Sequence, residues 1–149
     1  MEIKTLPART ILYSRRTTTL KDLAAFAGTA VRELYPDLAS GKLLVTGPQY
    51  WIYLGADGKP HTTFTLDIAI PVTGDTSGCA NNVRELPAFR CVTYQLKGPW
   101  EKIAGAYDEI FGYIYGNKLE YSGETRELYH QIDFEHPENN EVEIQVGIK

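Results

Sequence analysis

Two predicted strands of this chain carry aromatic side chains and a carboxylate at alternating positions. Trp51 and Tyr53 alternate on the first strand, and Glu127 and Tyr129 alternate on the second. Alternate residues of a strand point to the same face of a sheet, so each pair shares a face. A carboxylate among aromatic rings suits two kinds of chemistry. It can be the counter-ion of a cationic ligand, to which the rings add cation–π attraction, or a base whose pKa is raised by burial.

Each of these residues also has a plainer interpretation. Glu127 alone is typical of a solvated or salt-bridged surface residue, and the neighbouring Arg126 points to the opposite face, where it does not neutralise Glu127. The aromatic side chains could form a minor core beneath the loops at 73–83 and 116–124, or a dimer contact. The pattern alone leaves these alternatives open.

Composition and charge argue against several other classes of function. The net charge is −4 and Arg15-Arg16 is the only compact basic pair, so we expect no nucleic-acid binding by this chain alone. No stretch reaches the roughly 20 apolar residues of a membrane helix and no signal peptide pattern begins the chain, so we expect no membrane association and a cytoplasmic location. We expect no metal and no cofactor, because ligand spacing is missing among Cys79, Cys91, His61, His130 and His136.

The sequence contains two similar copies. Leu6-Pro7-Ala8 returns as Leu86-Pro87-Ala88, and the same spacing matches apolar positions of two predicted helices. We therefore predict a single domain over residues 1–149, with repeat one at about 3–72 and repeat two at about 84–148. A duplicated fold has a junction between its halves, and such junctions hold ligands.

Each copy has the pattern of strand, helix, strand, strand. Apolar residues recur every three or four positions in the helices and alternate in the strands. This pattern predicts an α+β fold: one antiparallel sheet with two helices on one face and a ligand groove between the repeats. The expected strands are 6–16, 42–54, 62–72, 86–97, 125–134 and 141–148, and the expected helices are 20–38 and 99–115.

Alternation also predicts which strand face lies under the helices. On the third strand of each copy this face carries Phe64, Leu66, Ile68, Ile70, Val142, Ile144 and Val146. On the second strands we assign the covered face to Ile52, Leu54, Leu128 and Ile132. The open face, away from the helices, then carries Trp51, Tyr53, Glu127 and Tyr129.

Five short stretches occur in the order of a known family: Leu6-Pro7-Ala8-Arg9, residues 47–53, residues 64–72, residues 98–101 with Ala106-Tyr107, and Glu127-Leu128-Tyr129. Together they resemble the GyrI-like family, the effector-binding domain of bacterial transcription regulators of the AraC and MerR types. The similarity spans about residues 3–148.

The resemblance implies two strand-helix-strand-strand units with a ligand groove where they meet. In members that bind lipophilic cations, the position matching Glu127 holds the central carboxylate, ringed by tyrosines. The resemblance therefore implies Glu127 as a site residue, with Tyr129, Tyr53 and Trp51 as walls. Regulator members also carry a helix-turn-helix segment, which this sequence lacks, so we expect a stand-alone member.

We hypothesise a small-molecule binding protein whose groove accepts bulky apolar or aromatic compounds, cations among them. One alternative suggested by the resemblance is a hydrolase of reactive cyclopropane-bearing compounds, in which Glu127 is the general base and Tyr53 or Tyr129 donates a proton. Another is a protein-docking modulator of a transcription regulator or of DNA gyrase. Its open face would imitate the charge of DNA through Asp67, Glu141 and Glu143.

Overall fold

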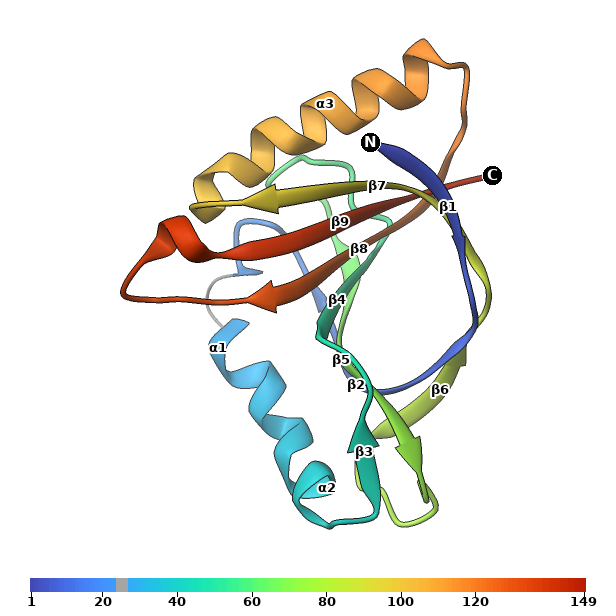
Figure 1. Cartoon of the computed structure of the whole chain (residues 1–149), viewed down its shortest axis with the longest axis vertical. Helices are drawn as coiled ribbons and strands as arrows, with labels where there is room; N and C mark the ends of the chain where they lie inside the picture. The colour runs from blue at the N-terminus through green and yellow to red at the C-terminus, as the bar shows by residue number, and fades with distance from the viewer. Residues whose placement is uncertain (24–26) are drawn as a thin grey trace.

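The computed structural model describes residues 1–23 and 27–149 of the chain. Over these residues one open antiparallel sheet has nine strands in the order β1-β7-β9-β8-β4-β5-β2-β6, with β3 paired to β5 (Figure 1). The strands are β1 (Glu2–Leu6), β2 (Arg9–Thr18), β3 (Leu43–Val45), β4 (Gln49–Leu54), β5 (Phe64–Gly74), β6 (Asn82–Leu86), β7 (Phe89–Lys97), β8 (Tyr121–Gln131) and β9 (Glu141–Ile148). The helical segments are α1 (Ala27–Ala30), η2 (Val31–Leu34), α2 (Tyr35–Ala39), η3 (Trp100–Lys102), α3 (Ile103–Gly116) and η4 (Pro137–Asn139). The predicted α+β class is confirmed.

The two halves of the sheet meet where β4 lies beside β8. Trp51 is directly opposite Glu127 in this pair, and Gln49 is opposite Tyr129. The next strand outward is β5 on one side and β9 on the other, so the strand order is symmetric about this junction. None of the helices in the described ranges combines the length and apolarity that a bilayer crossing requires.

Proline interrupts two of the predicted elements. The strand predicted at 42–54 is divided into β3 and β4, because Pro48 has no N–H with which to continue the ladder. The helix predicted at 20–38 is described as a turn at 20–22 and then as α1, η2 and α2, while residues 24–26 lie outside the described part. Its centre is a 3₁₀ turn, in which the Tyr35 N–H donates to the Arg32 carbonyl. Pro36 has no N–H to give that carbonyl its α-helical bond.

The sheet is also wider than predicted, because β1 and β6 form its two edges. Most residues of both strands are exposed or half-buried, and the sequence of an edge strand lacks the apolar alternation of a buried one. The loop predicted at 73–83 therefore overlaps the end of β5 and the start of β6.

Both helical segments pack on the same face of the sheet. α3 covers Ile144 and Val146 of β9, and Ala30 of α1 packs on Leu66 and Ile68 of β5. The helix-covered face predicted for the third strand of each copy is confirmed.

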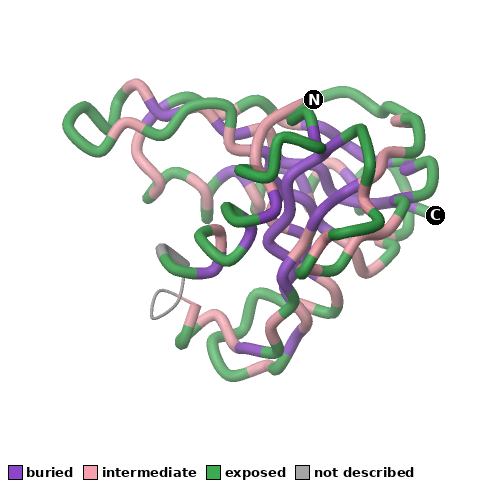
Figure 2. Tube along the Cα trace, turned by 90° about the horizontal axis from the view of Figure 1, so that it is seen from below, coloured by how far each residue is buried: buried purple, intermediate pink, exposed green. Residues whose placement is uncertain are grey.

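The opposite face is buried as well, although no helix of the described ranges covers it. Ile11, Tyr50, Ile52, Leu86 and Leu128 form a core cluster there. The sheet curls on itself in Figure 1, and in Figure 2 the buried segments, in purple, run through the middle of the molecule. Curling therefore removes from water a face that would otherwise be solvated.

The face predicted for the second strands is wrong. Ile52 and Leu128 lie on the helix-free face, so the alternate residues lie on the helix-covered one: Trp51, Tyr53, Glu127 and Tyr129. The error has a physical cause. Where both faces of a sheet are buried, an apolar residue can lie on either face and alternation does not indicate which one the helices cover.

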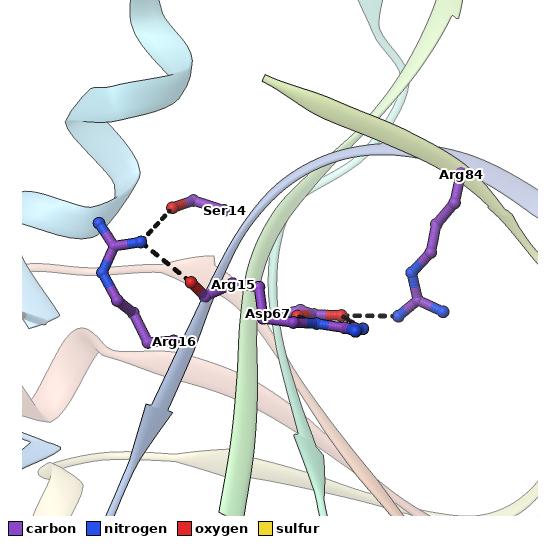
Figure 3. Close-up of polar contacts among 5 residues, drawn as sticks. All are labelled: Ser14, Arg15, Arg16, Asp67 and Arg84. Carbon is purple, nitrogen blue, oxygen red and sulfur yellow. Dashed lines mark hydrogen bonds and ion pairs between the residues drawn. The ribbon is translucent and has the colours of Figure 1, made fainter. Parts of the chain in front are cut away.

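On the helix-free face two arginines hold the buried carboxylate of Asp67 (Figure 3). Asp67 has no exposed surface, and it accepts from Arg15 Nε at 2.7 Å, from Arg15 Nη2 at 2.9 Å and from Arg84 Nη2 at 2.7 Å. Arg16, the next residue of β2, points to the other face and donates to Ser14 at 3.0 Å. Asp67 presents no free charge at the surface, so the prediction that it imitates DNA is wrong.

Replacing Asp67 with asparagine tests how much the salt bridges from Arg15 and Arg84 to Asp67 stabilise the fold. Asp67→Asn keeps the side-chain size but leaves two arginines without their carboxylate, so we expect the free energy of unfolding to fall by about 2 kcal/mol. Glu141→Gln is the matched control, because Glu141 and Lys97 are 4.0 Å apart at the exposed surface and contribute little. Urea denaturation measures both variants, and equal stabilities would contradict the role of the bridge.

Candidate functional site

The carboxylate of Glu127 lies near the middle of the sheet, on the helix-covered face. Glu127 is 4% exposed, and three tyrosine hydroxyls donate to it. Oε1 accepts from Tyr53 at 3.0 Å and from Tyr129 at 2.6 Å, and Oε2 accepts from Tyr107 at 2.5 Å. Because a carboxylate offers about four acceptor positions, one position on Oε2 is left for a further donor.

Strand register and one helix bring these side chains together. Tyr53 and Tyr129 each lie two residues along their strand from the Trp51–Glu127 pair, and therefore on the same face. Tyr107 comes from the second turn of α3. The structure brings together the four residues predicted as a site, which are Glu127, Tyr129, Tyr53 and Trp51. They lie on the face opposite to the predicted one.

Burial and hydrogen bonding move the pKa of Glu127 in opposite directions. Removal from water raises this pKa above its ordinary value, and the hydrogen bonds from Tyr107, Tyr129 and Tyr53 lower it by less. Burial, followed by the charge of Glu127, raises the pKa of all three tyrosines well above 10. The tyrosines are therefore neutral donors, which stabilise a charge on Glu127 without cancelling it.

The neighbouring cation takes no part in this site. Arg126 lies on the opposite face, as predicted, where it is 2.5 Å from Glu124 and 3.7 Å above the ring of Phe89. Over the described ranges, no group of three or more His, Cys, Asp or Glu side chains could hold a metal ion. Neutral hydroxyls are thus the hydrogen-bond partners of Glu127 in this part of the chain.

A cavity of about 730 Å³ opens beside Glu127, between α3 and the strands β4 and β8. The charged side chains among its described walls are all acidic: Glu127, with Asp57 and Asp108, which are both exposed. A hydrogen bond from the Lys59 N–H is the main cause that lowers the pKa of Asp57 and keeps it ionised. The uncharged described walls are Leu20, Leu23, Trp51, Tyr53, Ala56, Gly58, Ile103, Ala104, Tyr107, Phe111, Tyr115, Tyr121, Thr125 and Tyr129.

Aromatic contacts orient the rings around the carboxylate. The centroids of Trp51 and Tyr129 are 5.4 Å apart, and Trp100 meets Tyr129 edge-on at 5.4 Å. Phe111 and Tyr121 make a similar edge contact at 5.2 Å. Such tilted and edge-to-face pairs are the favoured geometries for aromatic rings, so the walls are preorganised.

Two residues of this region were not predicted as site residues: Tyr107, which donates to the carboxylate, and Trp100, which packs on Tyr129. Tyr107 belongs to a row at i, i+4 spacing that faces the cavity, namely Ile103, Tyr107, Phe111 and Tyr115. A second row on the same helix packs on the sheet, namely Ala106, Ile110 and Ile114. Two adjacent apolar stripes indicate two different contacts, and the second stripe is the signal that could have identified Tyr107.

Comparison with known proteins identifies a family and similar folds. Residues 1–149 match the family described as the GyrI-like small molecule binding domain. EcmrR in its complex with DNA superimposes with a TM-score of 0.80 at 17% identity over 99% of this chain and 56% of that one, so this chain spans about half of EcmrR. SAV2435 bound to tetraphenylphosphonium superimposes with a TM-score of 0.74 at 16% identity, over 99% of this chain and 93% of that one.

A hydrolase from Listeria innocua gives a TM-score of 0.67 at 13% identity, over 99% of this chain and 91% of that one. At these identities the solved structures show a shared fold alone. No curated protein matches the sequence.

The raised pKa of Glu127 makes the stability of the fold depend on pH. The folded chain holds the Glu127 proton more tightly than the unfolded chain does. Binding of this proton therefore stabilises the fold, fully at pH values below the ordinary pKa of 4.5, and this stabilisation is lost as the pH rises through the raised pKa. We expect the parent chain to lose stability relative to Glu127→Gln, which does not titrate, as the pH rises above 4.5. Chemical denaturation at several pH values gives the free energy of unfolding of each chain. The value for the parent minus the value for Glu127→Gln should fall as the pH rises, and a constant or rising value would contradict the raised pKa.

Proposed function

The chain belongs to the GyrI-like family of small-molecule binding domains, and we propose that it binds bulky apolar or aromatic cations in a groove centred on Glu127. One observation carries this proposal: the carboxylate is buried and accepts hydrogen bonds from neutral tyrosines, with no cation beside it in the described part of the chain. A cationic ligand supplies the missing counter-ion.

The aromatic walls favour an organic cation over a small inorganic ion. A small ion loses a large hydration free energy on entering an apolar cavity, and the one unused acceptor position of Glu127 does not replace that shell. A bulky cation is weakly hydrated, and the ring faces of Trp51 and Tyr129 attract it. The volume of about 730 Å³ suits a drug-sized molecule.

Few directional contacts line the groove, which favours broad selectivity. Burial of apolar ligand surface contributes about 25 cal/mol per Å², whatever the exact shape of the ligand. Asp57 and Asp108, both exposed, add longer-range attraction for a positive charge. Ligands that differ in outline but share one positive charge are therefore expected to compete for the same groove.

Two ions of similar shape and opposite charge test this proposal. We expect tetraphenylphosphonium to bind and to change the fluorescence of Trp51 and Trp100, and tetraphenylborate to bind at least about tenfold more weakly. Glu127→Gln keeps the shape of the side chain and removes its charge, so it should weaken phosphonium binding about tenfold without weakening borate binding. Glu141→Gln, the same change outside the groove, is the control and should leave both affinities unchanged. Equal affinities for the two ions in the parent chain would contradict the proposal.

A second candidate is hydrolysis of a strained electrophile such as a reactive cyclopropane-bearing compound. The raised pKa of Glu127 and the unused acceptor position on Oε2 favour it, because a water held there can lose its proton to the carboxylate. The water oxygen would bond to a ring carbon while the strained ring bond breaks. Tyr53 or Tyr129 would then protonate the carbon that departs, and the proton on Glu127 would restore that tyrosine.

Turnover separates this candidate from binding alone. The chain is incubated with a cyclopropane-bearing alkylator, and the hydrolysed product is quantified by mass spectrometry. Product that disappears in Glu127→Gln supports the hydrolase. An inactive parent chain, or equal turnover by Glu127→Gln, would reject the hydrolase and leave the binding proposal standing.

A further inference from the structure

The connection between β8 and β9 displays an aromatic side chain that the described part of the chain leaves uncovered. Phe134 is 90% exposed, and Ile132, two residues earlier, is 42% exposed. Single apolar residues are common at protein surfaces. An almost fully exposed phenylalanine next to a second exposed apolar residue is less common, and large aromatics of this kind mark contact sites.

Hydrogen bonds anchor the loop on both sides of Phe134. The buried Asn140 accepts from the Asp133 N–H at 2.7 Å through its side chain and from the Gly98 N–H at 2.9 Å through its carbonyl. The Asp133 carboxylate accepts from the Glu135 N–H at 3.1 Å. Phe134 lies between these anchors, so a partner that covers it orders little additional chain on binding.

The loop that carries Phe134 is acidic. Residues 132–140 contain three acidic side chains and no Lys or Arg. Glu135 is exposed, with no ion pair within the described ranges, and Glu138 is exposed at 3.6 Å from His136. Carboxylates of this kind repel the phosphates of nucleic acids and of anionic membranes.

We propose that Phe134 anchors a contact with another protein, whose surface offers a small apolar pocket bordered by lysine or arginine side chains. The ring fills the pocket and loses its contact with water, while Glu135 and Glu138 face the basic border. This surface is separate from the groove, because no residue of 130–140 is among the described walls of the cavity beside Glu127.

A second copy of this chain is a poorer partner. The large cavity described beside Glu127 could admit a phenyl ring, but its charged walls are Glu127, Asp57 and Asp108. Like charges would oppose the approach of the acidic loop. The smaller described cavity offers one lysine, Lys97, which is 4.0 Å from the carboxylate of Glu141. Neither of these two cavities therefore offers an unpaired basic border, and we assign the partner to a different protein.

Photocrosslinking at the exposed position tests this inference. Phe134→p-benzoylphenylalanine is expressed in cells of the organism that encodes the chain, with Leu44→p-benzoylphenylalanine as the control, because Leu44 is an exposed apolar residue of β3. We expect an adduct with one other protein at position 134 that is absent at position 44.

The crosslinked protein is then identified, purified and titrated against the full chain. We expect Phe134→Ser to raise the Kd at least about tenfold, while Leu44→Ser leaves it unchanged. The double variant Glu135→Gln, Glu138→Gln should reduce the dependence of Kd on salt. Melting temperatures equal to that of the parent chain show that the variants are folded.

Three outcomes would overturn the proposal. They are the absence of an adduct specific to position 134, an adduct with a second copy of this chain, and a partner whose affinity is unchanged by Phe134→Ser. A Kd that does not depend on salt concentration would contradict the part of the proposal that gives the partner's pocket a border of lysine or arginine.

Discussion

A carboxylate removed from water must be hydrogen-bonded, and in this chain neutral hydroxyl groups meet that requirement for Glu127. The other buried acid shows the contrast. Asp67, on the helix-free face, is held by Arg15 and Arg84, so its charge is compensated within the fold. Glu127 has an aromatic cavity beside it in place of a cation. One buried acid is therefore paired with cations of the fold, while within the described ranges the other is hydrogen-bonded to neutral groups only, and this difference is the basis of the proposed ligand site.

The position of this acid follows from the way the two halves of the sheet meet. β4 and β8 pair so that Trp51 lies opposite Glu127, and alternation then brings Tyr53 and Tyr129 to the same face. α3 lies over this face and adds the hydroxyl of Tyr107. Because the sheet curls and buries its helix-free face by itself, the helix-covered face is free to hold a cavity at the junction.

Much of this arrangement could be predicted from the sequence. Alternation and helical periodicity predicted the α+β class and the covered face of β5 and β9. The duplication and the family resemblance predicted that Glu127 lies with Trp51, Tyr53 and Tyr129. The covered face of β4 and β8 could not be predicted, because curling buries Ile52 and Leu128 although no described helix covers them. The contact of Tyr107 with Glu127 depends on how α3 docks on the sheet, which periodicity alone does not specify. The edge strands β1 and β6 lack a buried face and with it the signal that alternation requires.

Direct titration of the Glu127 carboxyl group tests most directly whether the fold holds an uncompensated acid. The carboxyl carbon can be followed by NMR with labelled glutamate and assigned through Glu127→Gln. The arrangement predicts a pKa above 4.5 in the parent chain and a further increase in Tyr107→Phe, because burial raises this pKa and the Tyr107 hydrogen bond lowers it. A pKa at or below 4.5, or one that Tyr107→Phe leaves unchanged, would contradict it.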